Sequence, residues 1–221
     1  MSTAGDLLLL ATDPGSGRSG IGMMEVDYVM GGAMLYDLVT LGRLRLDGEG
    51  RKARVTVDDP SPIDDPALEA AFARVRDRKP AKAQSIVGRL GKHGQKNLYR
   101  VLSDEGVVRP RDAKLLGLIP LTRHDVIDSA RRDRLLERIR GALLHGQEPE
   151  VETGPLIGLL SAGELVKLVV DKPDRKRAKK RAAEIAEGDW ASESVRVAIQ
   201  AARAAMTAAV VAASAASAGS S

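Results

Sequence analysis

Residues 30–46 read MGGAMLYDLVTLGRLRL, and this stretch decides the class of the fold. From Met30 to Leu41 the apolar residues recur at spacings of three and four, which is the period of an amphipathic α-helix. Gly42 follows where a helix C-terminus favours a residue that tolerates a positive φ angle. Beyond it, arginine and leucine alternate strictly, as they do in a half-buried β-strand. The stretch therefore predicts a helix that leads directly into a hairpin.

The hairpin is predicted from two alternating runs, residues 43–46 and 55–57, which flank a Gly-rich turn. Its polar face would carry Arg43, Arg45 and Arg54. A helix followed by a basic hairpin is also typical of a winged-helix nucleic-acid-binding protein, so this function stands as an alternative. The basic charge is spread over several elements and is not collected on one recognition helix, which makes nucleic acid the less favoured partner.

Helices dominate the prediction for the rest of the chain, because aromatic residues make up only 2% of it and an all-β fold normally uses many more. In the first half of the chain we predict a short buried helix at residues 7–10, a Gly- and Ser-rich loop at 14–22, a helix from Asp65-Pro66 toward Lys79-Pro80, and helices around 86–90 and 98–102. An apolar second hairpin follows at 107–121. The rest of the chain is predicted to form a helix capped by Asp128, a helix capped by Thr153 that continues to Val169, a basic helix over Arg175–Glu187 and a last helix over 192–213. The fold class is mainly α, with a central helical bundle surrounded by amphipathic helices and one or two β-hairpins. Residues 1–221 would form a single domain, with an ordered core over about 6–213 and a frayed tail at 214–221.

The residue types exclude several kinds of chemistry. Without cysteine, the chain has no disulfide, thiolate nucleophile or cysteine-bound zinc site. The three histidines, His93, His124 and His145, do not pair at metal-ligand spacing, so no metal and no other cofactor is expected. Asp64 and Asp65 belong to an aspartate cluster, but the prolines between its members indicate a loop and a helix cap, not paired catalytic carboxylates. The sequence predicts a protein that is not an enzyme.

Charge and hydropathy indicate a cytoplasmic protein. No basic region precedes an apolar stretch at the N-terminus, and the apolar run at 7–10 is far shorter than the roughly 20 residues of a spanning helix. A longer alanine-rich stretch near the C-terminus is interrupted by Arg196 and Arg203. The densest basic run, between Lys172 and Arg181, is interpreted as a solvated helix face in preference to a binding patch. Arginine outnumbers lysine about two to one, a bias that suggests a GC-rich, bacterial genome.

Four segments of the chain resemble, in their order and spacing, the segments of a known protein family. They are the apolar run at 7–10 ahead of a loop, the stretch 32–44, the stretch 60–68 with Lys79-Pro80 downstream, and residues 105–108 leading through the apolar hairpin to Thr122, Arg123, His124 and a basic helix. Together they span about residues 6–213 and are similar to the Golgi phosphoprotein 3 family. The resemblance implies a helical domain with a central bundle and peripheral β-hairpins. It also implies that this domain functions as a non-enzymatic peripheral membrane adaptor.

In eukaryotes, members of this family bind phosphatidylinositol 4-phosphate on Golgi membranes and short cytosolic tails of glycosyltransferases. The resemblance therefore implies two classes of partner, an anionic membrane lipid at the cytosolic membrane face and the cytosolic tails of membrane enzymes. It also implies that the apolar hairpin contacts the membrane or a second copy of the chain, forming a homo-oligomer; its residues here are Leu115, Leu116, Leu118, Ile119 and Leu121. From the residues alone, an interior strand pair explains the hairpin equally well. A scaffold that binds only protein remains a further alternative for the whole chain.

The family's phosphate pocket combines a Trp and an Arg near the second helix with two Arg three apart on a later helix. Here the first two positions fall near Gly22 and Gly31, so both side chains are missing, and Gly31 is interpreted as a place of close helix packing. On the later helix Lys92 keeps a positive charge, while Gln95 stands at the second position. With the neighbouring cations included, the residues expected to bind lipid are Lys92, Arg89, Lys96 and Arg100. Without the Trp and Arg side chains of the family's pocket, we expect general attraction to anionic lipid and only a weak preference for phosphatidylinositol 4-phosphate.

Overall fold

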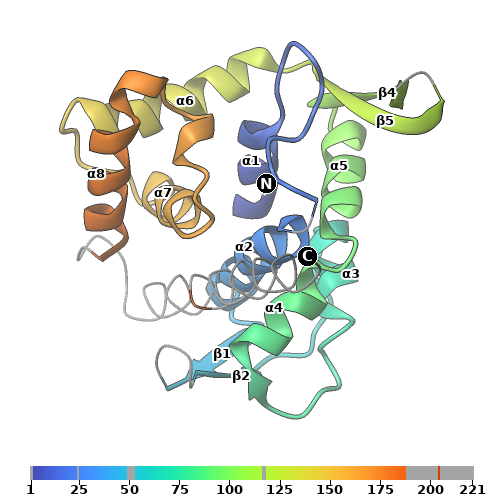
Figure 1. Cartoon of the computed structure of the whole chain (residues 1–221). Coiled ribbons are helices and arrows are strands. Elements are labelled where there is room, and N and C mark those ends of the chain that lie inside the picture. Colours follow the sequence, from blue (N-terminus) through green and yellow to red (C-terminus); the bar gives the residue numbers. More distant parts are fainter. Residues whose placement is uncertain (1, 24, 49–52, 116–117, 188–203, 205–221) are drawn as a thin grey trace, which may run out of the picture.

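The structure is a computed structural model that describes residues 2–23, 25–48, 53–115, 118–187 and 204. Within these residues eight α-helices and two small antiparallel sheets confirm the predicted mainly α fold (Figure 1). The helices are α1 (Thr3–Ala11), α2 (Val26–Thr40), α3 (Pro66–Phe72), α4 (Ala83–Gly91), α5 (Gly94–Asp104), α6 (Ser129–Leu144), α7 (Thr153–Ala162) and α8 (Arg175–Glu187). The strands are β1 (Leu44–Asp47), β2 (Arg54–Val57), β3 (Ala81–Lys82), β4 (Val108–Leu115) and β5 (Ile119–Val126).

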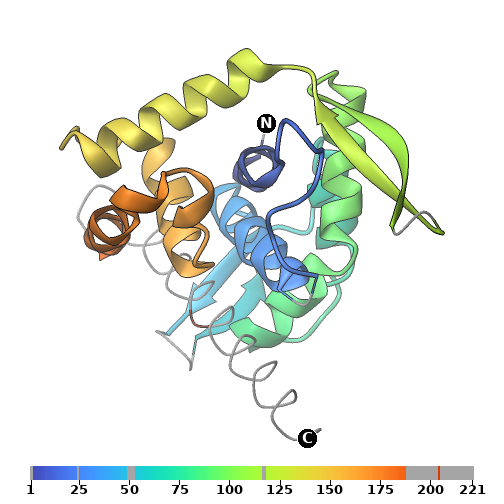
Figure 2. The same ribbon diagram turned by 45° about the horizontal axis from the view of Figure 1, so that its top comes forward.

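Helix α1 lies at the centre of the described fold. Its consecutive leucines, from Leu7 to Leu10, are all buried, and a helix that is apolar all round must be enclosed by other elements. It contacts α2, α5, α6 and α7. Figure 2 looks almost along α1 and shows these helices arranged around it. The short buried first helix predicted from the sequence is therefore confirmed.

Helix α2 and the sheet that follows it keep the order predicted from the sequence. The helix is buried along most of its length and ends at Thr40, and Gly42 then takes a φ of 69° that lets the chain turn into β1. Strands β1 and β2 pair antiparallel with Leu44 opposite Val57, so that Leu44 enters the core and Arg45 is exposed. The predicted hairpin is confirmed. Strand β3, which pairs with β2, was not predicted, because two residues are too few to show a period.

Side-chain caps confirm two of the predicted helix starts. The carboxylate of Asp65 accepts hydrogen bonds from the amides of Ala67 and Leu68 at 2.8 and 2.9 Å. That of Asp128 accepts one from the amide of Arg131 at 2.9 Å. Helix α8 has the bounds predicted for the basic helix, and β4 and β5 form the predicted second hairpin.

Two predicted details of α7 are wrong. Thr153 does not cap the helix but is its first residue, and the N-cap residue Glu152 makes no side-chain capping bond. The helix was expected to continue to Val169 but ends at Ala162. Glu164 takes a left-handed φ of 55°, and the chain passes into a short 3-10 turn.

The last predicted helix, over 192–213, and the predicted tail at 214–221 lie outside the described residues, apart from Ala204. Among the helices that the structure describes, none is both long enough and apolar enough to cross a lipid bilayer. The same part of the chain contains no group of three or more His, Asp or Glu side chains placed to hold a metal ion.

Candidate functional site: a basic cavity beside helix α4

Two of the four cations predicted to bind lipid lie close together at the end of α4. Arg89 and Lys92 are three residues apart, a spacing that places two side chains on one face of a helix, and both are exposed. They line a cavity of about 700 Å³, and most of its remaining lining comes from the segment that follows α3. We call it the basic cavity; it is lined by Ala73, Arg74, Asp77, Arg78, Arg89, Lys92 and His93.

Positive charge dominates this lining. Four cationic side chains, those of Arg74, Arg78, Arg89 and Lys92, accompany one carboxylate, that of Asp77. Within the described residues, none of the four forms an ion pair. Unpaired cations around an open space attract anions, and a guanidinium group can bind a phosphate through two parallel hydrogen bonds. The chemistry of the cavity is that of a phosphate or carboxylate site.

The segment that follows α3 reaches the cavity because that helix ends early. The helix was predicted to continue toward Lys79-Pro80, but it ends at Phe72 and a series of turns follows. Val75, only 1% exposed, anchors these turns in the core. The prediction of a continuous helix is therefore wrong here, and the turns change where each arginine of the segment lies.

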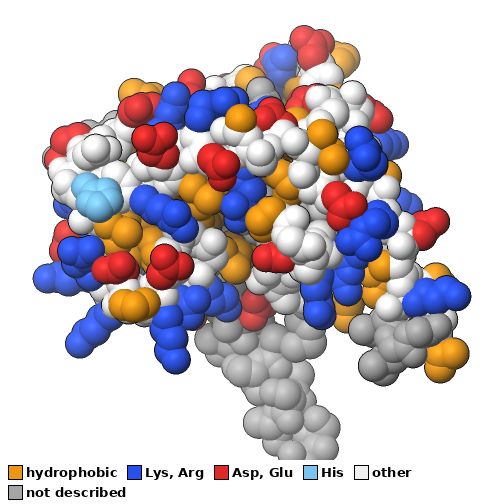
Figure 3. Space-filling model, turned by 90° about the horizontal axis from the view of Figure 1, so that it is seen from above, with side chains coloured by type: hydrophobic (Ala, Val, Ile, Leu, Met, Phe, Trp, Pro, Cys, Tyr) orange, Lys and Arg blue, Asp and Glu red, His pale blue; other side chains and the backbone are white. Residues whose placement is uncertain are grey.

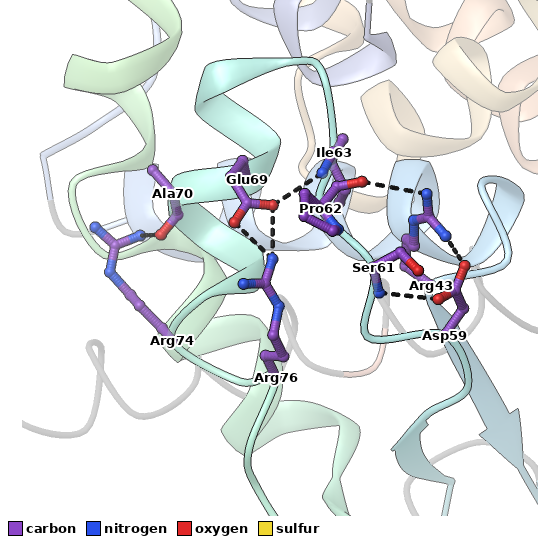
Figure 4. A network of polar contacts seen from close by, with 9 residues as sticks. All are labelled: Arg43, Asp59, Ser61, Pro62, Ile63, Glu69, Ala70, Arg74 and Arg76. Carbon is purple, nitrogen blue, oxygen red and sulfur yellow. Dashed lines mark hydrogen bonds and ion pairs between the residues drawn. The ribbon is translucent and has the colours of Figure 1, made fainter.

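Neighbouring arginines of these turns have different partners (Figure 4). Arg74 lines the basic cavity while its Nη1 donates to the carbonyl of Ala70 at 2.8 Å. Arg76 instead donates to the carboxylate of Glu69 at 2.7 Å and lies over the ring of Phe72, with Cζ 4.9 Å from the ring centroid. This contact also holds the pKa of Glu69 below its usual value. The charge of Arg76 is thus neutralised, whereas that of Arg74 is available to a ligand.

The junction between α4 and α5 adds a helix N-terminus to the rim of the cavity. His93, which lines the cavity, has a left-handed φ of 59° and is the N-cap residue of α5. Its side chain makes no capping hydrogen bond, and the first turn of α5 holds no acidic residue. Because a helix N-terminus carries a partial positive charge, the backbone adds to the positive potential of the side chains.

Gly31 and Gly91 determine how α4 is held against α2. A Cβ atom on Gly31 would lie 2.9 Å from the amide nitrogen of Gly91 and closer still to the carbonyl oxygen of Val87. No side chain fits at position 31 unless the two helices separate, so the prediction of close helix packing there is confirmed. The same contact leaves no room for an arginine at this position. Gly22, expected near the tryptophan position of the family's pocket, is exposed and lies outside the basic cavity.

The other two cations predicted to bind lipid are placed elsewhere. Lys96 and Arg100 are exposed on α5, one helical turn apart, and neither lines the basic cavity. Conversely, the sequence does not predict Arg74 and Arg78 as lipid-binding residues, because the segment that carries them is interpreted as part of a helix. The only sequence signal for them was the density of basic residues between Arg74 and Lys79.

The arginines of the first hairpin are engaged within the protein. Arg43 forms an ion pair with Asp59 (Figure 4), and Arg54 donates to the carbonyl of Pro80 at 2.6 Å. Arg45 has two carboxylates at 3.6 and 3.8 Å. A wing that binds a nucleic-acid backbone neutralises phosphates with unpaired cations, so the ion pairs of Arg43 and Arg45 weigh against the winged-helix alternative.

The basic run of α8 is part of a mixed-charge surface. Arg177 pairs with Asp174 at 3.1 Å, and Arg181 pairs with Glu184 at 3.5 Å. These pairs agree with the interpretation of α8 as a solvated helix. Figure 3 shows that the face of the molecule seen from above likewise carries acidic and basic side chains next to each other, with no large area of only positive or only negative charge.

A larger cavity of about 900 Å³ is lined by parts of α1, α2, α6 and α7. Its buried and half-buried charged groups have partners. The two carboxylate oxygens of Asp37 accept hydrogen bonds from the amides of Thr3 and Ala4, each at 2.9 Å, and Arg131 donates to Asp6 at 2.8 Å. Burial nonetheless raises the pKa of Asp37 to about 6. Because these charges are balanced within the protein, the basic cavity is the better site for an anion.

The second hairpin projects from the body of the protein (Figure 1). Leu118 near its tip is 84% exposed, so an interior position is wrong for this residue. Leu121 is partly buried. Leu116 and the side chains of Leu115 and Ile119 lie outside the described part of the chain. The described residues therefore place one leucine of the predicted contact surface in solvent.

The base of this hairpin is anchored to the core. The ring of His124 in β5 stacks on that of Tyr99 in α5, with centroids 3.6 Å apart and 1° between the planes. The hydroxyl oxygen of Tyr99 lies 2.9 Å from that of Thr12, and the amide of His124 donates to the carbonyl of Gly17 at 3.0 Å. Burial also lowers the pKa of His124. The exposed tip is thus carried on a base that is held in place.

The fold and the site define a mainly helical protein with an open basic cavity and a projecting hairpin. The family model described as Golgi phosphoprotein 3 (GPP34) matches residues 4–202, and the chain therefore belongs to the Golgi phosphoprotein 3 family. The resemblance carried by the four sequence segments is confirmed. No curated protein matches the sequence significantly.

Proposed function

We propose that this protein is a non-enzymatic peripheral membrane adaptor that binds anionic phosphate headgroups in the basic cavity. The observation that carries the proposal is the group of unpaired cations at the end of α4, where Arg78, Arg89 and Lys92 line a space of about 700 Å³. Membership of the Golgi phosphoprotein 3 family, an adaptor family, supports this class of function.

Affinity for the headgroup would come chiefly from charge. A basic residue near an anionic bilayer contributes about 1 kcal/mol of attraction, which salt screens over roughly 10 Å at 0.1 M. Among the described residues, no Trp, Tyr or Phe lines the basic cavity, and close packing excludes an arginine at Gly31. We therefore expect little selectivity for an inositol ring.

The second hairpin would supply an apolar contact beside the electrostatic one. The exposed side chain of Leu118 can enter the headgroup region of a bilayer or contact a second copy of the chain. Docked in this way on the cytosolic face, the adaptor would meet the cytosolic tails of membrane enzymes, which are the second class of partner proposed.

Co-sedimentation with vesicles over a salt series tests the proposal. Phosphatidylcholine vesicles with and without phosphatidylglycerol are compared for the wild type, for Arg89→Gln/Lys92→Gln and for Lys96→Gln/Arg100→Gln. Both double variants remove two positive charges from exposed positions, but only the first pair lines the cavity. We expect binding to fall with salt, and the first variant to lose about tenfold in affinity or more.

Two results would count against this function. Equal losses in both double variants would assign binding to the overall charge of the protein and not to the cavity. Failure of anionic vesicles to retain the wild type at low salt would remove the membrane proposal and leave a scaffold that binds only protein. Duplex DNA, titrated over the same salt series, tests the nucleic-acid alternative, for which we expect the weaker binding.

A further inference from the structure

A second, smaller cavity continues the basic cavity along α4. It has a volume of about 410 Å³ and is lined by Asp77, Arg78, Lys79, Ala81, Ser85, Ile86 and Arg89. Three residues, Asp77, Arg78 and Arg89, line both cavities. The two cavities therefore adjoin at these three residues, and we call them together the basic groove.

One wall of the basic groove is formed by one face of α4 together with Lys92, the C-cap residue of that helix. Ser85 lines only the smaller cavity, Arg89 lines both, and Lys92 lines only the larger one. These residues are spaced by four and three, so they fall on one stripe of the helix. Lys92 lies seven residues after Ser85, so at 1.5 Å per residue the two are about 10 Å apart along the helix axis. The groove is thus long enough for two anionic groups.

The other wall is the segment after α3, which runs in the opposite order. Arg74 lines only the larger cavity, Arg78 lines both, and Lys79 lines only the smaller one. Each cavity therefore has at least one cation of its own, in addition to the two arginines that the cavities share. Lys79 forms no ion pair within the described residues, and a ligand confined to the larger cavity would leave it without a counter-charge.

The shared arginines are suited to bridge two anions. A guanidinium group has five N–H donors in a planar fork, so it can bind phosphate oxygens on two sides at once. Arg78 and Arg89 stand where such bridging is needed, because both line both cavities. Asp77 also lines both cavities and repels any anion there. A ligand with two phosphates meets that repulsion in both cavities, but it also gains Lys79, which a single phosphate in the larger cavity does not reach.

We infer that the basic groove binds two phosphate groups of one ligand, one in each cavity, with Arg78 and Arg89 between them. The inference rests on the proposed function and narrows its ligand class to molecules with two separate phosphates, either a lipid headgroup or a soluble bisphosphate. Selection is by the number of phosphates and not by a sugar ring. Phosphatidylinositol 4-phosphate then binds better than a lipid with one phosphate, but no better than another lipid with two.

Vesicles matched in surface charge separate this inference from simple charge attraction. Diphosphatidylglycerol carries two phosphates per headgroup, and phosphatidylglycerol at twice the mole fraction gives the same number of phosphates on the surface. We expect the wild type to bind the first vesicles about fivefold more tightly, since the second phosphate engages one further basic residue. Lys79→Gln should abolish the preference, because it lowers the affinity for diphosphatidylglycerol vesicles more than the affinity for phosphatidylglycerol vesicles. Lys92→Gln should weaken binding to both.

Titration calorimetry with glycerol 1,3-bisphosphate and glycerol 3-phosphate, at equal ionic strength, distinguishes the two sources of the ligand. A preference for diphosphatidylglycerol identifies a lipid headgroup. Tighter binding of the bisphosphate than of the monophosphate, without vesicle binding, identifies a soluble bisphosphate and removes the membrane proposal while the two-phosphate groove stands. Equal binding to both kinds of vesicle, with no preference for the bisphosphate, overturns the inference and leaves the proposed function intact. An unchanged preference in Lys79→Gln also overturns it.

Discussion

Gly31 of α2 and Gly91 of α4 bring the backbones of their helices into contact, with the amide nitrogen of Gly91 2.9 Å from the position that a Cβ atom on Gly31 would take. The contact fixes α4 against α2, which is itself buried against the centre of the fold. Arg89 and Lys92 stand two residues before and one residue after Gly91, so the same contact places the α4 wall of the basic groove.

A methyl group at this contact is expected to destabilise the protein. In Gly91→Ala the Cβ atom would collide with the carbonyl of Asp27 and force α2 and α4 apart, at a cost of about 1–3 kcal/mol in the free energy of unfolding. Gly88→Ala is the matched control in the same helix. Its Cβ would lie 3.7 Å from the ring of Tyr28, an ordinary contact, and alanine favours helix by up to about 1 kcal/mol.

Urea unfolding followed by circular dichroism measures both variants. We expect the midpoint to fall for Gly91→Ala and to stay or rise for Gly88→Ala. Similar midpoints for the two variants would show that α2 and α4 can separate without cost, and that the close contact does not set the position of the groove.

The sequence predicts the order of the elements well where the local signal is strong. The apolar period before Gly42 predicts α2, and Asp65 followed by Pro66 predicts the start of α3, because the cap and the helix period depend on neighbouring residues. The bounds of α8 are predicted because its alanines and isoleucine keep the helical period. Local chemistry thus accounts for most of the described fold.

The basic groove could be predicted only in part. Arg89 and Lys92 share one helix face, so their spacing brings them together in any fold that contains α4. Arg74 and Arg78 join them only because α3 ends at Phe72 and Val75 is drawn into the core, which is a tertiary effect. Sequence reasoning placed Lys96 in the same site because it lies near in the chain, but the left-handed turn at His93 starts a new helix before it.

Asp37 is expected to make stability depend on pH between about 4 and 6. Burial raises its pKa from the ordinary 3.8 to about 6, although the amides of Thr3 and Ala4 donate to its carboxylate. The folded state therefore holds the proton more tightly than the unfolded state does. The contribution of Asp37 to the free energy of unfolding is largest below pH 4 and falls, by up to about 3 kcal/mol, as the pH rises through 6.

Comparison with Asp37→Asn isolates this contribution, since the other titrating groups are present in both proteins. We expect the stability of the wild type relative to the variant to decline from pH 4 to 6.5 in urea unfolding experiments. A difference that stays constant, or that grows with pH, would mean that the two amide hydrogen bonds outweigh burial and keep the carboxylate ionised.

Removing the carboxylate from the basic groove is expected to strengthen the binding of anions. Asp77 is exposed and lines both cavities, so Asp77→Asn removes a repulsion without opening an ion pair within the described residues. We expect affinity for anionic vesicles to rise by about three- to fivefold at low salt, and the gain to shrink as salt increases. Asp104→Asn, at the far end of α5, changes the net charge equally and serves as the control. Equal gains in both variants would argue against an anion in the groove.

Leu118→Asp tests whether the hairpin tip is a contact surface. The side chain is 84% exposed and the hairpin is anchored at its base by the stack of His124 on Tyr99, so the substitution should leave the free energy of unfolding within about 0.5 kcal/mol of the wild type. If the tip enters a bilayer, vesicle binding should weaken several-fold at all salt concentrations, because a buried charge is costly whatever the screening. If the tip joins two copies of the chain, the mass measured by light scattering should fall instead.

Val151→Asp, on a residue 81% exposed near α7, is the matched control and should change neither vesicle binding nor the measured mass. A variant that binds vesicles and assembles as the wild type does would exclude Leu118 from both contacts, and a marked loss of stability would mean that the leucine packs against the protein.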